Sequence, residues 1–273
     1  MARPEDLPDF EQPPITEVAV SVQFEPLAGF TFSEIGPLRE VFRDRFPNVE
    51  YQPPIPPNFE TFGTAGQGGM TTFQLQFVPS AGIPRVWLLD EQGVQLLQFQ
   101  PDRLVHNWRK IGQGEEYPRY ERIRDTLFRE LDDLAKFVAQ HQLGELVPNQ
   151  CELTYVNQFP APNGFGAVAS EVLTVWSKPE SACLGEPEDV VINARFPIME
   201  GDTQVGRLFS QFGPAFDRTG SPVVQLMLIA RGPPTTPTFG GVGSFLDIAR
   251  DRIVRGFAAL TTERMHREWQ RRA

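Results

Sequence analysis

The fold is decided by one stretch, which begins FQPDRLVHNWRK at residues 99–110, continues through an amphipathic segment at 117–143 and ends CELTYVNQF at 151–159. In the first part, Leu104 and Trp108 alternate with polar residues, as in a strand with one buried face. In the middle part, apolar residues recur every three or four positions, which predicts a long helix. The last part alternates again. We therefore interpret the stretch as strand, helix, strand, joining two halves of the chain.

Each half shows a similar order of elements, although the residues themselves do not repeat. We predict strands at 15–24, 73–77, 86–89, 94–100, 103–108, 151–159, 190–198, 204–213 and 222–231. Helices are predicted from a cap at Thr31 or Ser33 through Phe46, at 117–143, at 164–176 and from Ser244 onwards. Residues 48–70 are predicted to be a loop, with a flexible Gly63–Gly69 run. Thr261 is expected to cap a short terminal helix.

These elements predict an α+β protein of two similar lobes, each running strand, helix, antiparallel strands, long helix. An antiparallel sheet with one apolar face must be covered, and long amphipathic helices cover it. We place a flexible acidic arm at 1–14, an N-terminal lobe at 15–146 and a C-terminal lobe at 147–273. The halves suggest an internal duplication. The element order is similar to that of TATA-binding-protein-like and helix-grip folds, which host unrelated functions.

Composition restricts the class of function. The 273 residues carry a formal net charge of −10, which argues against broad binding to nucleic-acid phosphates. The C-terminus is locally basic, so nucleic acid stays open only through its arginines. No apolar run reaches the roughly 18 residues that span a bilayer, and the N-terminus lacks the apolar region of a secretory signal. We predict no disulfide between the two cysteines, and we expect a cytoplasmic protein without a membrane partner.

Four short motifs resemble those of a sporadically distributed bacterial protein family of unknown function. They are Pro13-Pro14-Ile15-Thr16-Glu17, Asp102-Arg103 with Asn107-Trp108-Arg109, Glu152-Leu153-Thr154-Tyr155-Val156-Asn157, and Phe245-Leu246-Asp247 with Phe257 and Trp269. The resemblance covers most of the chain and implies no known activity. Members often carry a His-Glu or His-Asp pair where this chain has Arg250-Asp251, so no role of that histidine transfers. Patchy occurrence is typical of accessory genes, including defence genes.

No strong catalytic signature is present in the sequence. His106, His141 and His266 are scattered, and neither cysteine lies at metal-ligand spacing from them. We therefore predict no catalytic residue, no metal and no cofactor. Cys151 and His106 would form a nucleophile and its base only if their strands brought them together.

A polar cluster within the opening stretch is the best candidate for a ligand site. If residues 103–109 form a strand whose core face holds Leu104 and Trp108, then Arg103, Asn107 and Arg109 point outwards together. In the later strand, Glu152 lies on the face opposite Tyr155 and Asn157, and could pair with Arg103 or Arg109. The predicted ligand-binding residues are Arg103, Asn107, Arg109, Glu152, Tyr155 and Asn157. Two interpretations stay open: a network that holds the lobes in register, or a site for an anion or polar ligand.

The sequence favours a non-enzymatic binding or regulatory protein, of the accessory or defence type, over an enzyme. Its partner would be a protein or a small polar ligand, bound on the sheet surface or in the cleft under the helices. The alternatives are an enzyme for a phosphorylated or nucleotide-like substrate, acting through Arg103, Arg109 and Glu152, and a nucleic-acid-binding protein that uses the C-terminal helix. The oligomeric state and the identity of the ligand are not specified by these patterns.

Overall fold

The computed structural model describes residues 4–62, 82–112, 114–161, 164–177, 183–185 and 187–272. The predicted strand at 73–77 and the predicted flexible run at 63–69 lie outside these residues.

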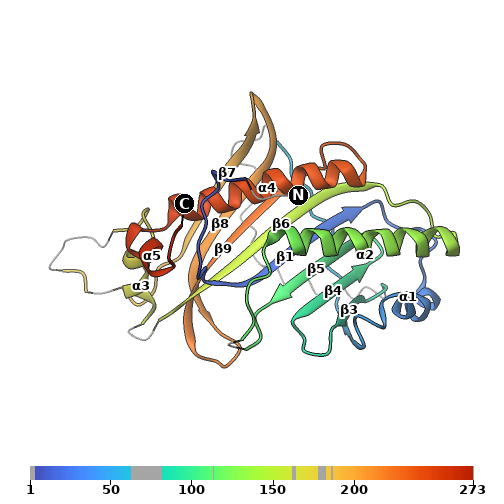
Figure 1. Cartoon of the computed structure of the whole chain (residues 1–273), viewed down its shortest axis with the longest axis horizontal. Helices are drawn as coiled ribbons and strands as arrows, with labels where there is room; N and C mark the ends of the chain where they lie inside the picture. The colour runs from blue at the N-terminus through green and yellow to red at the C-terminus, as the bar shows by residue number, and fades with distance from the viewer. Residues whose placement is uncertain are drawn as a thin grey trace.

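Within the described ranges, nine strands form one antiparallel sheet (Figure 1). They are β1 (Ile15–Phe24), β2 (Asn48–Gln52), β3 (Arg85–Leu89), β4 (Gln95–Gln100), β5 (Arg103–Arg109), β6 (Pro148–Pro160), β7 (Ile192–Glu200), β8 (Thr203–Phe216) and β9 (Pro222–Gly232). Their order across the sheet is β2-β3-β4-β5-β1-β6-β9-β8-β7. The centre is the pairing of β1 with β6. Outwards from it, β5, β4 and β3 on one side correspond to β9, β8 and β7 on the other.

Two long helices cover one face of this sheet, as Figure 1 shows: α2 (Tyr120–His141) and α4 (Phe239–Leu260). Helix α2 packs on β5 and β1, whereas α4 packs on β6, β9 and β8. Shorter helices lie around them: η1 (Phe32–Glu34), α1 (Ile35–Phe42), α3 (Phe165–Val172) and α5 (Glu263–Glu268). The predicted α+β class, with helices packed on a curved antiparallel sheet, is confirmed. The division at residue 146/147 and the internal duplication stay predictions, and the sheet is continuous across that point.

Alternation along the central strands explains which face the helices cover. Leu104 and Trp108 of β5 are buried. Their neighbours on β1 are Val22 and Val18, which are fully buried on the same face. The predicted core face of β5 is therefore confirmed. His106 shares this face, and its imidazole meets Glu130 of α2 at 3.0 Å, so a buried polar pair lies inside the apolar layer.

Several boundaries differ from the predictions: the helix predicted at 164–176 ends at Val172, and the helix predicted through Phe46 ends at Phe42. Residues 48–52, predicted as part of a loop, form the edge strand β2. Helix α4 begins after Thr238, whose hydroxyl accepts the N–H of Gly241, and not at Ser244. The glycines of its first turns have low helix propensity, which conceals the start of the helix. Thr261 ends α4, and Thr262 precedes α5.

The acidic N-terminal arm packs against the C-terminal segment. Leu7 and Phe10 are buried, and Phe10 forms an isolated β-bridge with Arg271. The backbone N–H groups of Glu11 and Gln12 donate to the last turns of the chain. The arm is thereby held across the face that carries α2 and α4.

Candidate functional site

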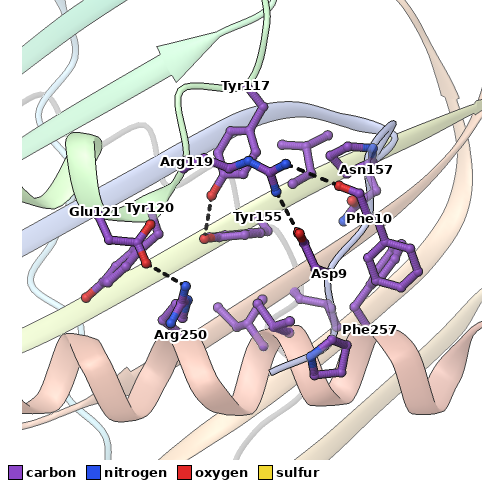
Figure 2. Close-up of a pocket in the computed structure, with 16 residues that line it drawn as sticks. Asp9, Phe10, Tyr117, Arg119, Tyr120, Glu121, Tyr155, Asn157, Arg250 and Phe257 are labelled. Atoms are coloured by element: carbon purple, nitrogen blue, oxygen red, sulfur yellow. Dashed lines mark hydrogen bonds and ion pairs between the residues drawn. The ribbon is translucent and has the colours of Figure 1, made fainter. Parts of the chain in front are cut away.

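A cavity of about 280 Å³ lies between the start of α2, the middle of α4 and the sheet, below the N-terminal arm (Figure 2). Its size is close to the lower end of ordinary small-molecule sites, which occupy roughly 300–1,000 Å³. Most of its wall is apolar, contributed by Phe10, Ile15, Leu228, Ile253, Val254 and Phe257. Because α2 packs on β5 and β1 and α4 packs on β6, β9 and β8, the space between the helices lies over the central strands.

Two tyrosine hydroxyls meet inside the cavity. The hydroxyl of Tyr155, on β6, lies 2.8 Å from that of Tyr117, which precedes α2, as drawn in Figure 2. Burial raises the pKa of Tyr117 well above its ordinary value, and the neighbouring Tyr155 raises it further. Tyr117 is therefore a neutral phenol at physiological pH. A neutral phenol both donates and accepts hydrogen bonds, so this part of the wall is polar without being charged.

An ion pair joins the two helices at the side of the cavity. The Arg250 guanidinium of α4 lies 2.7 Å from the Glu121 carboxylate of α2 and 5.4 Å above the ring of Tyr120. The Tyr120 hydroxyl donates to Asp247 over 2.8 Å. Desolvation, with the Asp247 carboxylate next, raises the pKa of Tyr120 well above its ordinary value. These contacts fix the spacing of α2 and α4, and hence the width of the cavity.

The N-terminal arm forms the roof. Arg119, immediately before α2, has a φ of 71° and directs its guanidinium to Asp9 at 2.8 Å. Phe10 packs edge-on against Phe257 of α4, with ring centroids 5.5 Å apart. A positive φ is rare for a residue with a side chain, so the backbone of Arg119 has an unusual conformation at the point where its side chain reaches the arm. The roof joins the segment just before β1 to the residue before α2, which is 110 residues away in sequence.

The chemistry of this cavity suits binding. Apolar walls favour a small ring or branched chain, and the two hydroxyls offer hydrogen bonds to one polar group of such a molecule. Arg119 and Arg250 each have a carboxylate partner, so the wall does not present an uncompensated charge through them.

The structure divides the six predicted site residues between opposite faces of the sheet. Tyr155 and Asn157 line the cavity between the helices, and Asn157 is buried as the strand pattern predicted. Arg103, Asn107 and Glu152 line a second cavity of about 190 Å³ on the helix-free face. Arg109, at the end of β5, does not line the second cavity. It donates instead to the Gly93 carbonyl over 2.7 Å.

Two details of the predicted cluster were wrong. Arg103 and Asn107 share the helix-free face but are not exposed, because residues 55–58 pass over it and Arg103 donates to the Pro56 carbonyl. Alternation assigns a face to a side chain and says nothing of a distant segment that covers it. Glu152 pairs with Arg231 of β9, and not with Arg103 or Arg109, because β9 is the strand next to β6 on that side.

Sequence reasoning missed Arg250, Tyr117 and the N-terminal arm as parts of the site. One signal was available for Arg250, since it occupies the apolar stripe of α4 at helical spacing with Leu246, Ile253 and Phe257. A charge at such a position requires a partner. The partner itself, Glu121, lies 129 residues away and could not be found from spacing.

Cys151 and His106 do not form a catalytic pair. They lie on β6 and β5 with β1 between them, and burial raises the pKa of the Cys151 thiol to about 12. Among the described residues, no cluster of three or more His, Cys, Asp or Glu side chains is arranged to hold a metal ion. In the same ranges, no helix has the length and apolar character needed to cross a membrane.

Most arginines of the C-terminal segment have carboxylate partners. Arg252 pairs with Glu200, Arg264 with Glu171 and Arg272 with Glu11. Arg255 pairs with both Asp6 and Asp251. The local excess of basic residues in the sequence is therefore compensated by acidic residues from other parts of the chain.

No protein-family model matches this chain, and no curated protein matches its sequence.

Proposed function

We propose that this protein is a non-enzymatic binding protein that takes a small, mainly apolar molecule carrying a hydroxyl or amide group into the cavity between α2 and α4. The observation that supports this most is the pair of hydroxyls, Tyr117 and Tyr155, meeting at 2.8 Å inside an otherwise apolar wall. Buried polar groups of this kind provide orientation and specificity, while the apolar surface provides most of the affinity.

The N-terminal arm closes the cavity on one side. It is held by the buried side chains of Leu7 and Phe10, by backbone hydrogen bonds to the last turns of the chain and by the Asp9–Arg119 pair. A ligand bound below the arm would therefore be well separated from water, which favours burial of its apolar part.

Phenol is the appropriate first probe, because it combines a flat apolar ring with one hydroxyl. Binding is measured by saturation-transfer NMR and by displacement within a panel of phenols, cyclic alcohols and aromatic amides. Tyr155→Phe removes a hydroxyl and keeps the ring, so affinity for phenol should fall about 2- to 13-fold, the value of one hydrogen bond. Tyr51→Phe, at an exposed tyrosine of β2, is the matched control and should leave affinity unchanged.

A second variant tests the location independently. Val254→Trp adds volume at the cavity wall, where Val254 is only partly buried, and should abolish binding while the protein stays folded. If the whole panel fails to bind the wild-type protein, or if Val254→Trp binds as the wild type does, the proposed site is wrong.

A further inference from the structure

The second cavity, on the helix-free face, lies across the centre of the sheet. The lateral row Gln23, Arg103 and Gln150 crosses β1, β5 and β6. The next row brings Glu152 beside Arg231 of β9. Residues 55–58 cover these rows from outside, since the Ile55 N–H and carbonyl bond to Gln100 and the Asn58 N–H donates to Gln23. The result is a partly covered cavity of about 190 Å³, lined mainly by polar residues.

Positive charge exceeds negative charge around this cavity. Four guanidinium groups lie in or beside it, and three carboxylates pair with three of them: Asp102 with Arg103, Glu152 with Arg231, and Glu60 with both Arg207 and Arg231. Within the described residues, no carboxylate lies at ion-pair distance from the fourth, Arg85. Desolvation and the neighbouring charge of Arg103 lower the pKa of Arg85. A cation that is half desolvated beside another cation is stabilised by an anion.

Two donors at this cavity have no acceptor in the described part of the chain. The amide nitrogen of Gln150 is buried, with the residue 4% exposed, and it has no hydrogen-bond partner. The Nε of Arg85 is also buried and without a partner. Both residues line the cavity. Because leaving a buried donor unpaired costs about 1–3 kcal/mol, the deeply buried Gln150 amide at this cavity indicates a group that supplies an acceptor.

A hydrogen-bonded chain holds Arg85 in place. Its Nη1 donates to Gln98 over 3.0 Å, Gln98 donates to Asn107 over 2.7 Å, and Asn107 donates to Glu17 over 2.6 Å. Each amide donates in the same direction, away from Arg85 and towards Glu17, so the bonds polarise one another. The chain uses Nη1 alone, and the Nε of Arg85 stays available. Glu17 is the nearest acid along this chain, and it lies beyond the cavity lining.

From the uncompensated Arg85, the unpaired buried amide of Gln150 and the cover that residues 55–58 provide, we propose a second binding site, on the helix-free face, for an oxyanion of phosphate size. The oxyanion would accept a hydrogen bond from the Gln150 amide and receive longer-range stabilisation from Arg103 and Arg85, because β4, β5 and β1 lie between the strands of Arg85 and Gln150. The site is separate from the cavity between the helices, and a free phosphate and a phosphate group on a small molecule share the chemistry that it recognises.

Inorganic phosphate is the probe, with sodium chloride of equal ionic strength and pH as the reference. Phosphate should raise the melting temperature of the whole chain by about 3 °C at tenfold its dissociation constant. In a ¹H–¹⁵N spectrum it should shift the side-chain amide signals of Gln150 and Gln98. The proposal is wrong if phosphate neither raises the melting temperature nor shifts these amide signals in the wild-type protein. It is also wrong if phosphate shifts only signals from other parts of the sheet.

Three variants locate the effect. Gln150→Glu is nearly isosteric and places a carboxylate in the cavity, so the variant should fold and lose the phosphate response. Arg85→Gln should weaken the response, since the cation without a carboxylate partner is gone. Arg43→Gln, at an exposed arginine of the other face, should keep it. A full response in Gln150→Glu would contradict the site. Tyr155→Phe should respond to phosphate like the wild type, so failure of the phenol site leaves this test intact.

Discussion

The ion pair between α2 and α4 should show strongly non-additive mutational effects. The side chain of Arg250 is 9% exposed and that of Glu121 25% exposed, with a separation of 2.7 Å. Glu121→Gln leaves a guanidinium that is nine-tenths buried without its counterion, and breaking a buried pair in this way costs about 3–5 kcal/mol. We expect about 3 kcal/mol of lost unfolding free energy, the lower end, because a quarter of Glu121 is already hydrated.

The reverse change has a smaller effect. Arg250→Met leaves Glu121, which water reaches, and removes a cation–π contact with Tyr120, so we expect a loss of about 2 kcal/mol. The double variant Glu121→Gln/Arg250→Met has no uncompensated charge at these positions, and the methionine fills the space of the arginine with an apolar side chain. It should lose only about 1 kcal/mol. The expected coupling between the two positions is therefore about 4 kcal/mol.

Urea denaturation followed by tryptophan fluorescence measures these free energies, provided that the m-values agree among the variants. The control is the exposed pair Glu40–Arg43, whose side chains are 61% and 63% exposed and whose coupling should not exceed about 0.5 kcal/mol. If the losses at Glu121 and Arg250 add to within about 0.5 kcal/mol, the two residues are not coupled and do not fix the spacing of the helices.

Three further predictions concern packing, pH and thiol chemistry. Gly232→Ala should lower the unfolding free energy by about 1–3 kcal/mol, because the new Cβ would lie 2.5 Å from the Val205 carbonyl oxygen and 2.5 Å from the ring of Phe245. The control is Gly36→Ala in α1, whose Cβ meets no atom within 4 Å. Denaturation should show this variant to be as stable as the wild type or more stable. The raised pKa of Tyr117 means that the folded state holds the phenol proton more tightly than the unfolded state does. The stability that this proton contributes is complete below about pH 10 and is lost as the pH rises through the folded pKa. Tyr117→Phe should therefore reduce the fall in melting temperature at high pH, and an identical fall in both proteins would be inconsistent with the burial of the phenol. A thiol reagent at pH 8 should modify only the exposed Cys183 in the folded chain, and both cysteines after unfolding. Rapid modification of both cysteines in the native protein would contradict the burial of Cys151.

The architecture was largely predictable because both of its periodic signals are local. Leu104 and Trp108 share a strand face, and the apolar repeat from Tyr120 to Val138 requires a helix that covers such a face. The start of α4 was missed because glycines weaken the helical signal before Ser244. Strand β2 was missed because it is exposed at the edge of the sheet, where little burial imposes an alternating pattern.

The sites were predicted only in part, for a physical reason. The patterns gave the correct face for Asn157 and for Arg103, since side-chain direction along a strand follows from the sequence. They did not give partners, because Glu152 meets Arg231 through the order of strands in the sheet, which no local pattern specifies. The cavity between the helices depends on contacts between segments more than 100 residues apart, such as Asp9 with Arg119.

A crystal soaked in 4-bromophenol, measured at the bromine absorption edge, tests the central claim most directly. The cavity between α2 and α4 should contain an anomalous peak, with the phenol hydroxyl within hydrogen-bond distance of Tyr117 or Tyr155 and the ring against Val254 and Phe257. Val254→Trp crystals treated in the same way should lack that peak. Bromine bound only elsewhere in the wild-type protein, or an unchanged peak in the Val254→Trp crystals, would contradict the assignment of this cavity as the binding site.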